Sequence, residues 1–368
     1  MDVNYSARRG TFPRVMREPN RDHGTDGELD RNRRRTLKAL GAAGATAGVG
    51  GAAGWSDVAS ALGRRGGQSA VPRQQTDGAV LEDRYLRIAL LAAREAAAIH
   101  DEQFGQIKTA ETKAPQQLVT EVDRNAERAI RQRIREELGD EFEDDNHALF
   151  GEEQGGTRSG DFVWIIDPLD GTTNYVRGIP HFCVSIAVVR EGELHAGLVY
   201  YSPRDEVYAA VAGEGAIKFE DTGGNPTQVE SVVPLSVTNV STIEESLNSV
   251  GFYSGASAID PRYLLLFREF VAESLGIRQL GAAAVDMVLL AEGAFDTFSC
   301  WALKPVDVAA GTLIVREAGG RVTDFRGDDD VQTVLRGNVL ATNGELHGSV
   351  LGRYRNPRAT LDDLLPEN

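Results

Sequence analysis

The sequence predicts a layered α/β protein, and three observations support this fold class. Long segments with apolar residues at helical spacing alternate with short runs of strand-forming residues. Glycine, proline and charged residues separate the strand-like runs, as turns require. At 368 residues the chain is also long enough to bury a sizeable core. We therefore expect sheets covered by helices after an N-terminal extension.

The expected elements follow from local composition, taken in chain order. Residues 83–104 are rich in Ala and Leu and predict a long helix, and residues 123–138 predict an amphipathic helix that ends at Gly139. Four strand-like runs come next, at 162–166, 182–189, 194–201 and 207–212. Three later helices are expected: one from Asp260-Pro261 through Leu275, one over 281–292, and one that opens with Lys304-Pro305 and ends at Gly319-Gly320.

The charge is acidic and unevenly distributed. The whole chain has 39 Lys and Arg against 55 Asp and Glu, a formal net charge of −16. Residues 1–75 carry a net charge of +6, so the remainder carries −22. An acidic surface repels nucleic acid and anionic membranes, which argues against both as partners. Only 5 of the basic residues are Lys, and this Lys-poor, acidic balance is typical of proteins from extreme halophiles.

Residues 1–80 predict an export signal. Arg33 and Arg34, followed by Leu37-Lys38, resemble the twin-arginine motif, and a Gly- and Ala-rich segment follows at 39–54. That segment is too short and too weakly apolar for stable membrane insertion. We expect export by the twin-arginine route. The alternative is a disordered basic tail on a cytoplasmic protein.

The most informative segment is residues 164–174, Trp-Ile-Ile-Asp-Pro-Leu-Asp-Gly-Thr-Thr-Asn, with Glu152-Glu153 just upstream. Apolar residues suited to a buried strand lead into Asp167 and Asp170, and the residues that follow can begin a helix. Carboxylate oxygens are the ligands that Mg²⁺ prefers. The first amides of a helix favour a bound anion. The segment therefore predicts a hard-metal site beside a phosphate-binding turn.

Four other blocks accompany this segment in order along the chain. They are Leu-Val-Thr-x-x-Asp at 118–123, Gly-Glu-Glu at 151–153, Gly-Ala-Ala-Ala at 281–284 and Asp-x-Ala-Ala-Gly at 307–311. Together the five blocks resemble the inositol monophosphatase family over roughly residues 81–351. The resemblance implies the αβαβα sandwich of the inositol monophosphatase and fructose-1,6-bisphosphatase type.

The resemblance also implies how the chain is divided. Residues 1–80 would form the extension, 81–225 a lobe with most metal ligands, 226–353 a lobe with the last metal Asp, and 354–368 a tail. The lobes are expected to divide near Gly223-Gly224-Asn225-Pro226. A homodimer is the candidate assembly.

The resemblance further assigns roles to residues of the five blocks. Two or three Mg²⁺ ions are expected. Their expected ligands are the side chains of Glu152, Asp167, Asp170 and Asp307 and the backbone carbonyl of Leu169. The expected catalytic residues, which orient a metal-activated water, are Glu152, Thr172 and Asp123. The expected substrate-binding residues are Asp170, Gly171, Thr172, Thr173, Gly281, Ala282, Ala283 and Asp307. Glu153 is expected to support the ligands rather than to bind an ion.

The expected activity is Mg²⁺-dependent hydrolysis of a small polyol or sugar phosphate, with fructose 1,6-bisphosphate among the candidates. The sequence departs from inositol-directed members at two places, because Val306 stands where they have Trp and Cys300 where they have a hydroxyl-accepting Glu. We therefore expect weak selectivity for inositol. Lys304 and Arg177 are candidates for receiving a second anionic group. The alternative function is an exported protein that binds a phosphate ester without turnover.

Each site residue also has a simpler interpretation when it is taken alone. An Asp at a strand end commonly caps a turn, a Glu pair is commonly solvated, and Thr172 and Asp307 would suit helix caps. Neither cysteine has metal or disulfide spacing, and Cys183 lies in a strand-like run that predicts an inert core position. None of the 6 His is assigned a catalytic role, because a solvated or hydrogen-bonded His is the simpler interpretation of each.

Overall fold

The structure is a computed structural model that describes residues 76–106, 110–114, 117–225, 229, 231–252 and 259–358. These residues belong to a compact unit that spans Ala70–Asn368. Arg33 and Arg34, with most of the predicted extension, lie outside the described residues. A membrane-spanning helix is absent from the described ranges, since none of their helices combines the needed length with enough apolar character. The division into two lobes stays a prediction.

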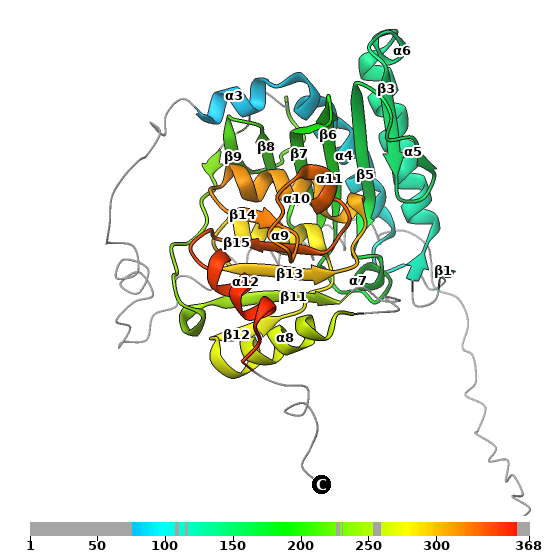
Figure 1. Cartoon of the computed structure of the whole chain (residues 1–368). Coiled ribbons are helices and arrows are strands. Elements are labelled where there is room, and N and C mark those ends of the chain that lie inside the picture. The colour runs from blue at the N-terminus through cyan, green and yellow to red at the C-terminus, as the bar shows by residue number, and fades with distance from the viewer. Residues whose placement is uncertain are drawn as a thin grey trace, which may run out of the picture. The chain divides into compact units, whose positions relative to one another are not determined.

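An eight-stranded sheet is the larger of the two main sheets (Figure 1). Its strands lie in the order β10-β9-β8-β7-β6-β5-β3-β4. Strand β5 runs parallel to β3, and the other neighbouring pairs of this sheet are antiparallel. The strands are β3 His147–Gly151, β4 Gly155–Gly156, β5 Phe162–Asp170, β6 Cys183–Arg190, β7 Glu193–Tyr201, β8 Glu206–Val211, β9 Gly215–Glu220 and β10 Val233–Pro234.

A five-stranded sheet forms a second layer, in the order β12-β11-β13-β15-β14. Strand β11 is parallel to β12 and β13, whereas β15 is antiparallel to β13 and β14. The strands are β11 Leu247–Phe252, β12 Gly276–Arg278, β13 Thr297–Trp301, β14 Arg321–Thr323 and β15 Val339–Thr342. Short elements complete the described chain, namely α3 Thr76–Glu82, β1 Glu111–Ala114, β2 Gln117–Val119, α6 Glu141–Asp144, α7 Thr172–Val176, η1 Ser202–Arg204, η2 Ile243–Glu245 and α11 Val331–Val334.

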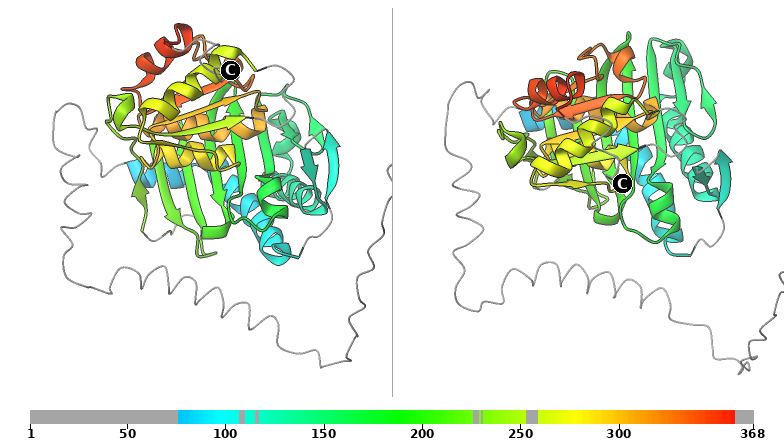
Figure 2. Two further views of the ribbon diagram at one scale, coloured as in Figure 1. Left: turned by 90° about the horizontal axis from the view of Figure 1, so that it is seen from below. Right: turned by 60° about the horizontal axis from the view of Figure 1, so that its bottom comes forward.

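Three pairs of helices alternate with the two sheets and give five layers, as Figures 1 and 2 show. The larger sheet has one pair on its outer face, the second pair lies between the sheets, and the third covers the smaller sheet. The outer pair on the larger sheet is α4 Arg84–Gln103 and α5 Glu121–Leu138. The pair between the sheets is α9 Ala283–Ala291 and α10 Pro305–Glu317, and the pair on the smaller sheet is α8 Pro261–Glu273 and α12 His347–Arg355. The predicted αβαβα fold class is therefore confirmed.

The two-residue repeat of the strands decides which helix layer each side chain meets. Along β5, Trp164 and Ile166 belong to the core cluster of α4 and α5, whereas Val163 and Ile165 belong to the cluster of α9 and α10. Leu340 of β15 faces the cluster of α8 and α12 in the same manner. Because both faces of β5 are buried, its sequence is a continuous apolar run rather than an alternating one.

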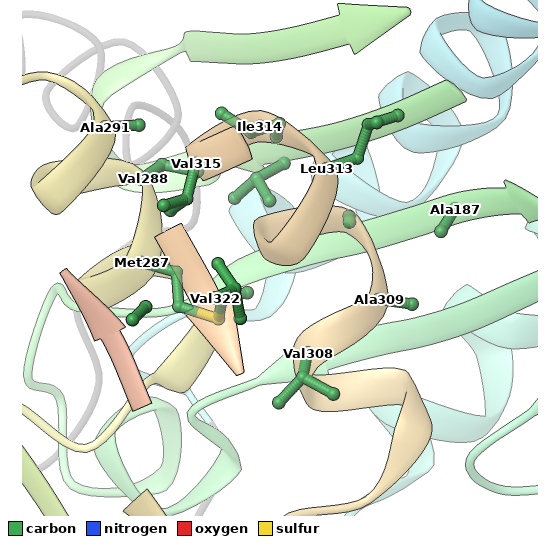
Figure 3. Close-up of a cluster of buried hydrophobic side chains, with 14 of the residues drawn as sticks. Ala187, Met287, Val288, Ala291, Val308, Ala309, Leu313, Ile314, Val315 and Val322 are labelled. Atoms are coloured by element: carbon green, nitrogen blue, oxygen red, sulfur yellow. The ribbon is translucent and has the colours of Figure 1, made fainter. Parts of the chain in front are cut away.

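Helix α10 is the central support of the site, since its residues 306–315 are all buried. Figure 3 shows Val308, Leu313 and Ile314 of this helix packed in the apolar cluster that it shares with α9. At Gly311 an added Cβ would lie 2.8 Å from the Met287 side chain, so glycine permits the close approach of α9 to α10. This packing fixes the N-terminus of α10, which carries Asp307.

Most predicted helices are observed with small changes at their ends. The helix expected over 83–104 is α4, whose N-cap Asp83 accepts a hydrogen bond from the Leu86 amide at 2.8 Å. The helix expected to reach Leu275 is α8, which ends earlier because Ser274 is extended and 276–278 pair with β11. The strands of the smaller sheet were not predicted from the sequence.

Candidate active site

A β-bulge at the end of β5 brings Asp167 and Asp170 to the same cavity. Asp167 lies opposite Ser185 of β6 and Asp170 lies opposite Cys183, so β5 has one residue more than β6 over this stretch. Residues three apart in a regular strand would face opposite sides of the sheet. The extra residue reverses this relation. Pro168, which has no N–H to donate to the ladder, lies within the bulge.

The turn after β5 is the predicted anion-binding turn. Gly171 has a φ of 92°, and a side chain there would come within 2.8 Å of the His181 carbonyl oxygen. Helix α7 begins at Thr172, whose Oγ1 donates to Asp123 Oδ1 at 2.8 Å and lies 3.1 Å from the Leu169 carbonyl. Asp123 also closes the capping box at the start of α5. A buried carboxylate therefore orients the Thr172 hydroxyl.

A buried ion pair holds the turn that carries Glu152. Glu127 of α5 is fully buried and accepts from Arg131 Nε at 2.8 Å. The same carboxylate accepts from the backbone amides of Glu153 and its successor, at 2.6 and 3.1 Å. A Cβ at Gly151 would lie 2.3 Å from Glu127 Oε1, so the turn needs glycine at this position. Glu127 thus positions Glu152 without contacting the cavity.

The first turn of α10 carries Asp307 into the same cavity. Its Oδ2 accepts from the Lys304 amide at 2.6 Å, as in a capping box. The Lys304 ammonium reaches across the site and donates to Glu152 Oε1 at 2.8 Å. Asp170 Oδ2 accepts from the Ala284 amide in the first turn of α9 at 2.7 Å. Four carboxylates are thereby held around one space: Asp167 and Asp170 of β5, Glu152 after β3, and Asp307 of α10.

That space is a cavity of about 280 Å³. It brings together all the predicted metal ligands and substrate-binding residues, which are Glu152, Asp167, Leu169, Asp170, Gly171, Thr172, Thr173, Gly281, Ala282, Ala283 and Asp307. Asp123, predicted as catalytic, is buried and acts on the cavity through its bond to Thr172. The roles of these residues as ligands and catalysts stay predictions, but their convergence is a property of the structure.

Burial and mutual repulsion raise the pKa values of the carboxyl groups at this cavity. For Asp167 burial is the largest cause, and the charges of Glu152, Asp170 and Asp307 raise its pKa further. Burial and then Asp307 likewise raise the pKa of Asp170. The pKa of Asp307 is raised to about 7, by burial first and then by Glu152. Burial raises the pKa of Asp123 to about 6. A bound cation would relieve this repulsion.

The donor chemistry of the cavity fits Mg²⁺, because carboxylates and a backbone carbonyl supply oxygen ligands. Among the residues that the structure describes, no three His, Cys, Asp or Glu side chains converge as a formed ion cage. Repulsion among the carboxylates opposes so close an arrangement, and one oxygen of Glu152 is bonded to Lys304. We expect cations to draw the carboxylates closer together.

Two polar residues beside the cavity were not predicted from the sequence. Asp286 of α9 lines the cavity, lies 3.2 Å from His181 Nε2 through Oδ1, and accepts from Ser249 Oγ at 2.8 Å through Oδ2. Asn174 Nδ2 donates to the carbonyls of His181 and Leu280, both at 2.8 Å. These bonds tie the α7 turn to the segment before α9. The available signal was a single acidic residue within the apolar run of α9.

The structure also places the two cysteines, Val306 and the two basic residues named from the sequence. Cys183 is buried as predicted, and burial raises the pKa of its thiol, which keeps it protonated. Cys300 lines the cavity, whereas Val306 is buried and is not part of the described lining. Arg177 is exposed and lies outside that lining, so the geometry does not support its expected role toward a second anionic group. Lys304 is engaged with Glu152.

Comparison with known proteins agrees with this geometry. The model of the inositol monophosphatase family matches residues 81–357. The Nus factor SuhB of Pseudomonas aeruginosa is 35% identical over 274 residues, covering 72% of this chain and 94% of that protein. The chloroplastic phosphatase IMPL1 of Arabidopsis thaliana is 35% identical over 298 residues, covering 78% of this chain and 74% of that protein. A solved inositol monophosphatase from Anabaena matches with a TM-score of 0.62 and 30% identity, covering 76% of this chain and 98% of that one.

Proposed function

The chain belongs to the inositol monophosphatase family, and we propose that it is a Mg²⁺-dependent phosphomonoesterase acting on a small organic phosphate ester. Polyol and sugar phosphates, including fructose 1,6-bisphosphate, are the members of this class expected from the sequence. The observation that carries the proposal is the convergence of Glu152, Asp167, Asp170 and Asp307 on one cavity beside the α7 turn. The family is typically metal-dependent, and a relative is named a phosphatase.

The roles of the residues follow from their positions. Glu152, Asp167, Asp170 and Asp307, with the Leu169 carbonyl, would hold two or three Mg²⁺ ions around the cavity. Bound Mg²⁺ supplies charge neutralisation, polarises the phosphoryl oxygens and lowers the pKa of an attacking water. The first amides of α7 have no partner within their own helix and are suited to the phosphoryl oxygens.

Thr172 and Glu152 would orient the attacking water. The Thr172 hydroxyl donates its hydrogen bond to Asp123, so its oxygen keeps lone pairs that can accept a hydrogen bond from a water in the cavity. The Glu152 carboxylate, fixed by the turn that Glu127 holds, is a second acceptor on the same cavity. Two acceptors fix the direction of the lone pair that attacks phosphorus. No covalent intermediate is required.

The alternative function is binding of a phosphate ester without turnover. Four carboxylates around an anion site are unfavourable for simple anion binding, because they repel a phosphate group unless cations intervene. Their presence therefore favours the enzyme. Turnover still needs a direct test, because the Pseudomonas aeruginosa relative is named a Nus factor rather than a phosphatase. The net charge of −22 beyond residue 75 argues against a direct contact with nucleic acid.

One assay tests the proposal. Phosphate release is measured from inositol 1-phosphate, fructose 1,6-bisphosphate and p-nitrophenyl phosphate, with and without Mg²⁺, at low and high KCl. Asp167→Asn and Asp170→Asn are expected to abolish Mg²⁺-dependent release while the circular dichroism spectrum stays that of the wild type. Asp145→Asn, at an exposed position, is the matched control. Activity within a few-fold of wild type in either cavity variant at saturating Mg²⁺ would defeat the assignment.

A further inference from the structure

Asp286 is a carboxylate of the cavity that belongs neither to the expected metal ligands nor to the phosphate-binding turn. It lies in the first turn of α9, where its amide donates to the Ala282 carbonyl at 3.0 Å, so the two residues share one side of the helix. Ala282 and Ala283 also line the cavity. We infer that Asp286 accepts a hydrogen bond from a hydroxyl group of the substrate's alcohol and so selects hydroxylated esters, an inference that rests on the proposed phosphatase function.

A chain of donors orients the Asp286 carboxylate. Its Oδ2 accepts from Ser249 Oγ at 2.8 Å, and its Oδ1 lies 3.2 Å from His181 Nε2. Because a carboxylate can only accept, we assign the ring proton to Nε2. In the neutral ring the other nitrogen, Nδ1, is an acceptor, and it lies 3.0 Å from the Tyr201 hydroxyl. Donation therefore runs from Tyr201 through His181 to Asp286, and these groups hold the carboxylate in place.

The same carboxylate keeps acceptor capacity for a ligand. Its two oxygens have about four lone-pair sites, and the contacts with His181 and Ser249 use one site on each oxygen. Asp286 is only 3% exposed and yet lines the cavity, so a donor for the remaining sites has to come from the cavity side. Cys300 stands where inositol-directed members have a hydroxyl-accepting Glu, and a thiol accepts weakly. Asp286 supplies the acceptor that Cys300 lacks.

His181 links this acceptor to the phosphate-binding turn. Its ring contacts Asp286, and its backbone carbonyl accepts from Asn174 Nδ2 of α7 at 2.8 Å. That carbonyl also lies against Gly171, since a Cβ there would come within 2.8 Å of it. Asn174 bonds in addition to the Leu280 carbonyl, shortly before α9. The hydroxyl acceptor and the amides expected to bind the phosphoryl group are therefore held at a fixed separation.

The packing of α9 favours hydroxyl acceptance over metal ligation by Asp286. Met287 and Val288, the next residues of the helix, are fully buried in the apolar cluster that Figure 3 shows. The Met287 side chain lies against Gly311 of α10, so α9 cannot rotate toward the other carboxylates without disrupting this packing. A cation would also compete with the donors that already bind both oxygens. A substrate hydroxyl needs only one remaining lone pair.

Asp286→Asn tests this role, because it removes the charge of the acceptor and keeps its shape. KM is measured with Mg²⁺ for inositol 1-phosphate and for cyclohexyl phosphate, which share a ring and differ in its other hydroxyl groups. The variant is expected to raise KM for inositol 1-phosphate roughly tenfold, since a charged acceptor forms the stronger hydrogen bond, and to change KM for cyclohexyl phosphate less than about twofold. Equal changes for both esters, or no change for inositol 1-phosphate, would overturn the inference.

Two further variants separate hydroxyl acceptance from a structural role. Asp296→Asn is the matched control, because Asp296 is a buried carboxylate outside the described lining, and both KM values are expected to stay unchanged. Ser249→Ala removes one donor to Asp286 and keeps the carboxylate. It is expected to raise KM for inositol 1-phosphate alone, by roughly twofold to fivefold. If Asp286→Asn does not fold, the split between the two esters in Ser249→Ala decides, and its absence would overturn the inference.

A Mg²⁺ titration distinguishes a hydroxyl acceptor from a metal ligand. The Mg²⁺ concentration that gives half-maximal release from cyclohexyl phosphate is expected to stay within about threefold of wild type in Asp286→Asn, because only the field of one charge near the ions is lost. A larger rise, of about tenfold or more, would show that Asp286 holds a cation and would overturn the inference.

The outcomes separate this inference from the proposed function. Absence of phosphate release from both esters and from p-nitrophenyl phosphate would reject the phosphatase activity itself. Release by the wild type, with the two KM values changed alike in Asp286→Asn, would reject only the role of Asp286. Release with KM for inositol 1-phosphate alone raised in that variant supports both.

Discussion

Replacing Asp307 by Asn is expected to stabilise the cation-free protein and to remove its response to Mg²⁺. Asp307 is buried at the start of α10, and its pKa is raised to about 7, by burial first and then by the charge of Glu152. Asn keeps an oxygen that can accept from the Lys304 amide, so the capping box is retained. The substitution therefore removes charge from the carboxylate cluster with little change in shape.

The sign and size of the effect follow from the pKa shift. The ordinary pKa is 3.8, so between that value and about 7 the folded protein binds a proton that the unfolded chain has released. The free energy of unfolding of the wild type consequently falls as pH rises through this window, and the full penalty is present above it. At about 1.4 kcal/mol per pKa unit, the penalty is on the order of 4 kcal/mol and is an upper figure, because neighbouring carboxyl groups share the protons.

Urea unfolding without divalent cations, at a pH near 8 and a pH near 4, measures this effect. Asp307→Asn is expected to be more stable than wild type by up to about 4 kcal/mol at the higher pH and nearly equal at the lower pH. Added Mg²⁺ is expected to stabilise the wild type strongly and the variant little. A variant that is no more stable at high pH, or that gains as much from Mg²⁺ as the wild type, would refute the reasoning.

Three further changes test the remaining assignments. Thr172→Ala is expected to lower kcat by roughly 100-fold; an effect seen only as weaker Mg²⁺ binding in calorimetry would argue against a role in orienting water. Glu127→Ala leaves the buried Arg131 guanidinium without its carboxylate partner and is expected to lower the free energy of unfolding by about 3 to 5 kcal/mol. The control is Glu121→Ala, at an exposed ion pair, which is expected to lose less than about 1 kcal/mol in the same urea titration. Arg33→Lys with Arg34→Lys is expected to leave phosphate release unchanged and to retain the protein in the cytoplasm on fractionation; wild-type protein found only there, with an intact N-terminus, would support the cytoplasmic alternative.

The sequence predicted the parts of the fold in which local pattern and tertiary role coincide. Helix α4 has a capping Asp83 and an unbroken apolar face, and both features are readable from neighbouring residues. Strands β5 to β8 contain long runs of apolar residues, because they are buried on both faces. The site blocks were predictable for the same reason, since each lies at the end or start of one element.

The smaller sheet was not predictable because its strands carry buried polar residues that resemble loop residues. Asn248 and Ser249 of β11 are fully buried, as is Thr297 of β13. Thr297 Oγ1 donates to Asn248 Oδ1 at 2.6 Å and Ser249 Oγ donates to Asp286. Such partners come from distant parts of the chain, so no local pattern reveals that these residues are satisfied inside a core. Glu127 was not predicted for the same reason, since the backbone amides that its carboxylate holds lie 26 and 27 residues away in the sequence.

Groups of the chain itself offset the negative charge of the carboxylate cluster, so folding does not depend on cation binding. Asp170 and Asp307 accept backbone amides, and Glu152 accepts the Lys304 ammonium. The raised pKa of Asp167 adds protonation as a further means of reducing the net charge. A domain that folds only around its metal lacks such substitutes. Here the backbone amides and the Lys304 ammonium bond to the carboxylate oxygens that an incoming cation needs. The free energy of those bonds is therefore subtracted from the affinity for Mg²⁺, and the protein is expected to be folded before the cations arrive.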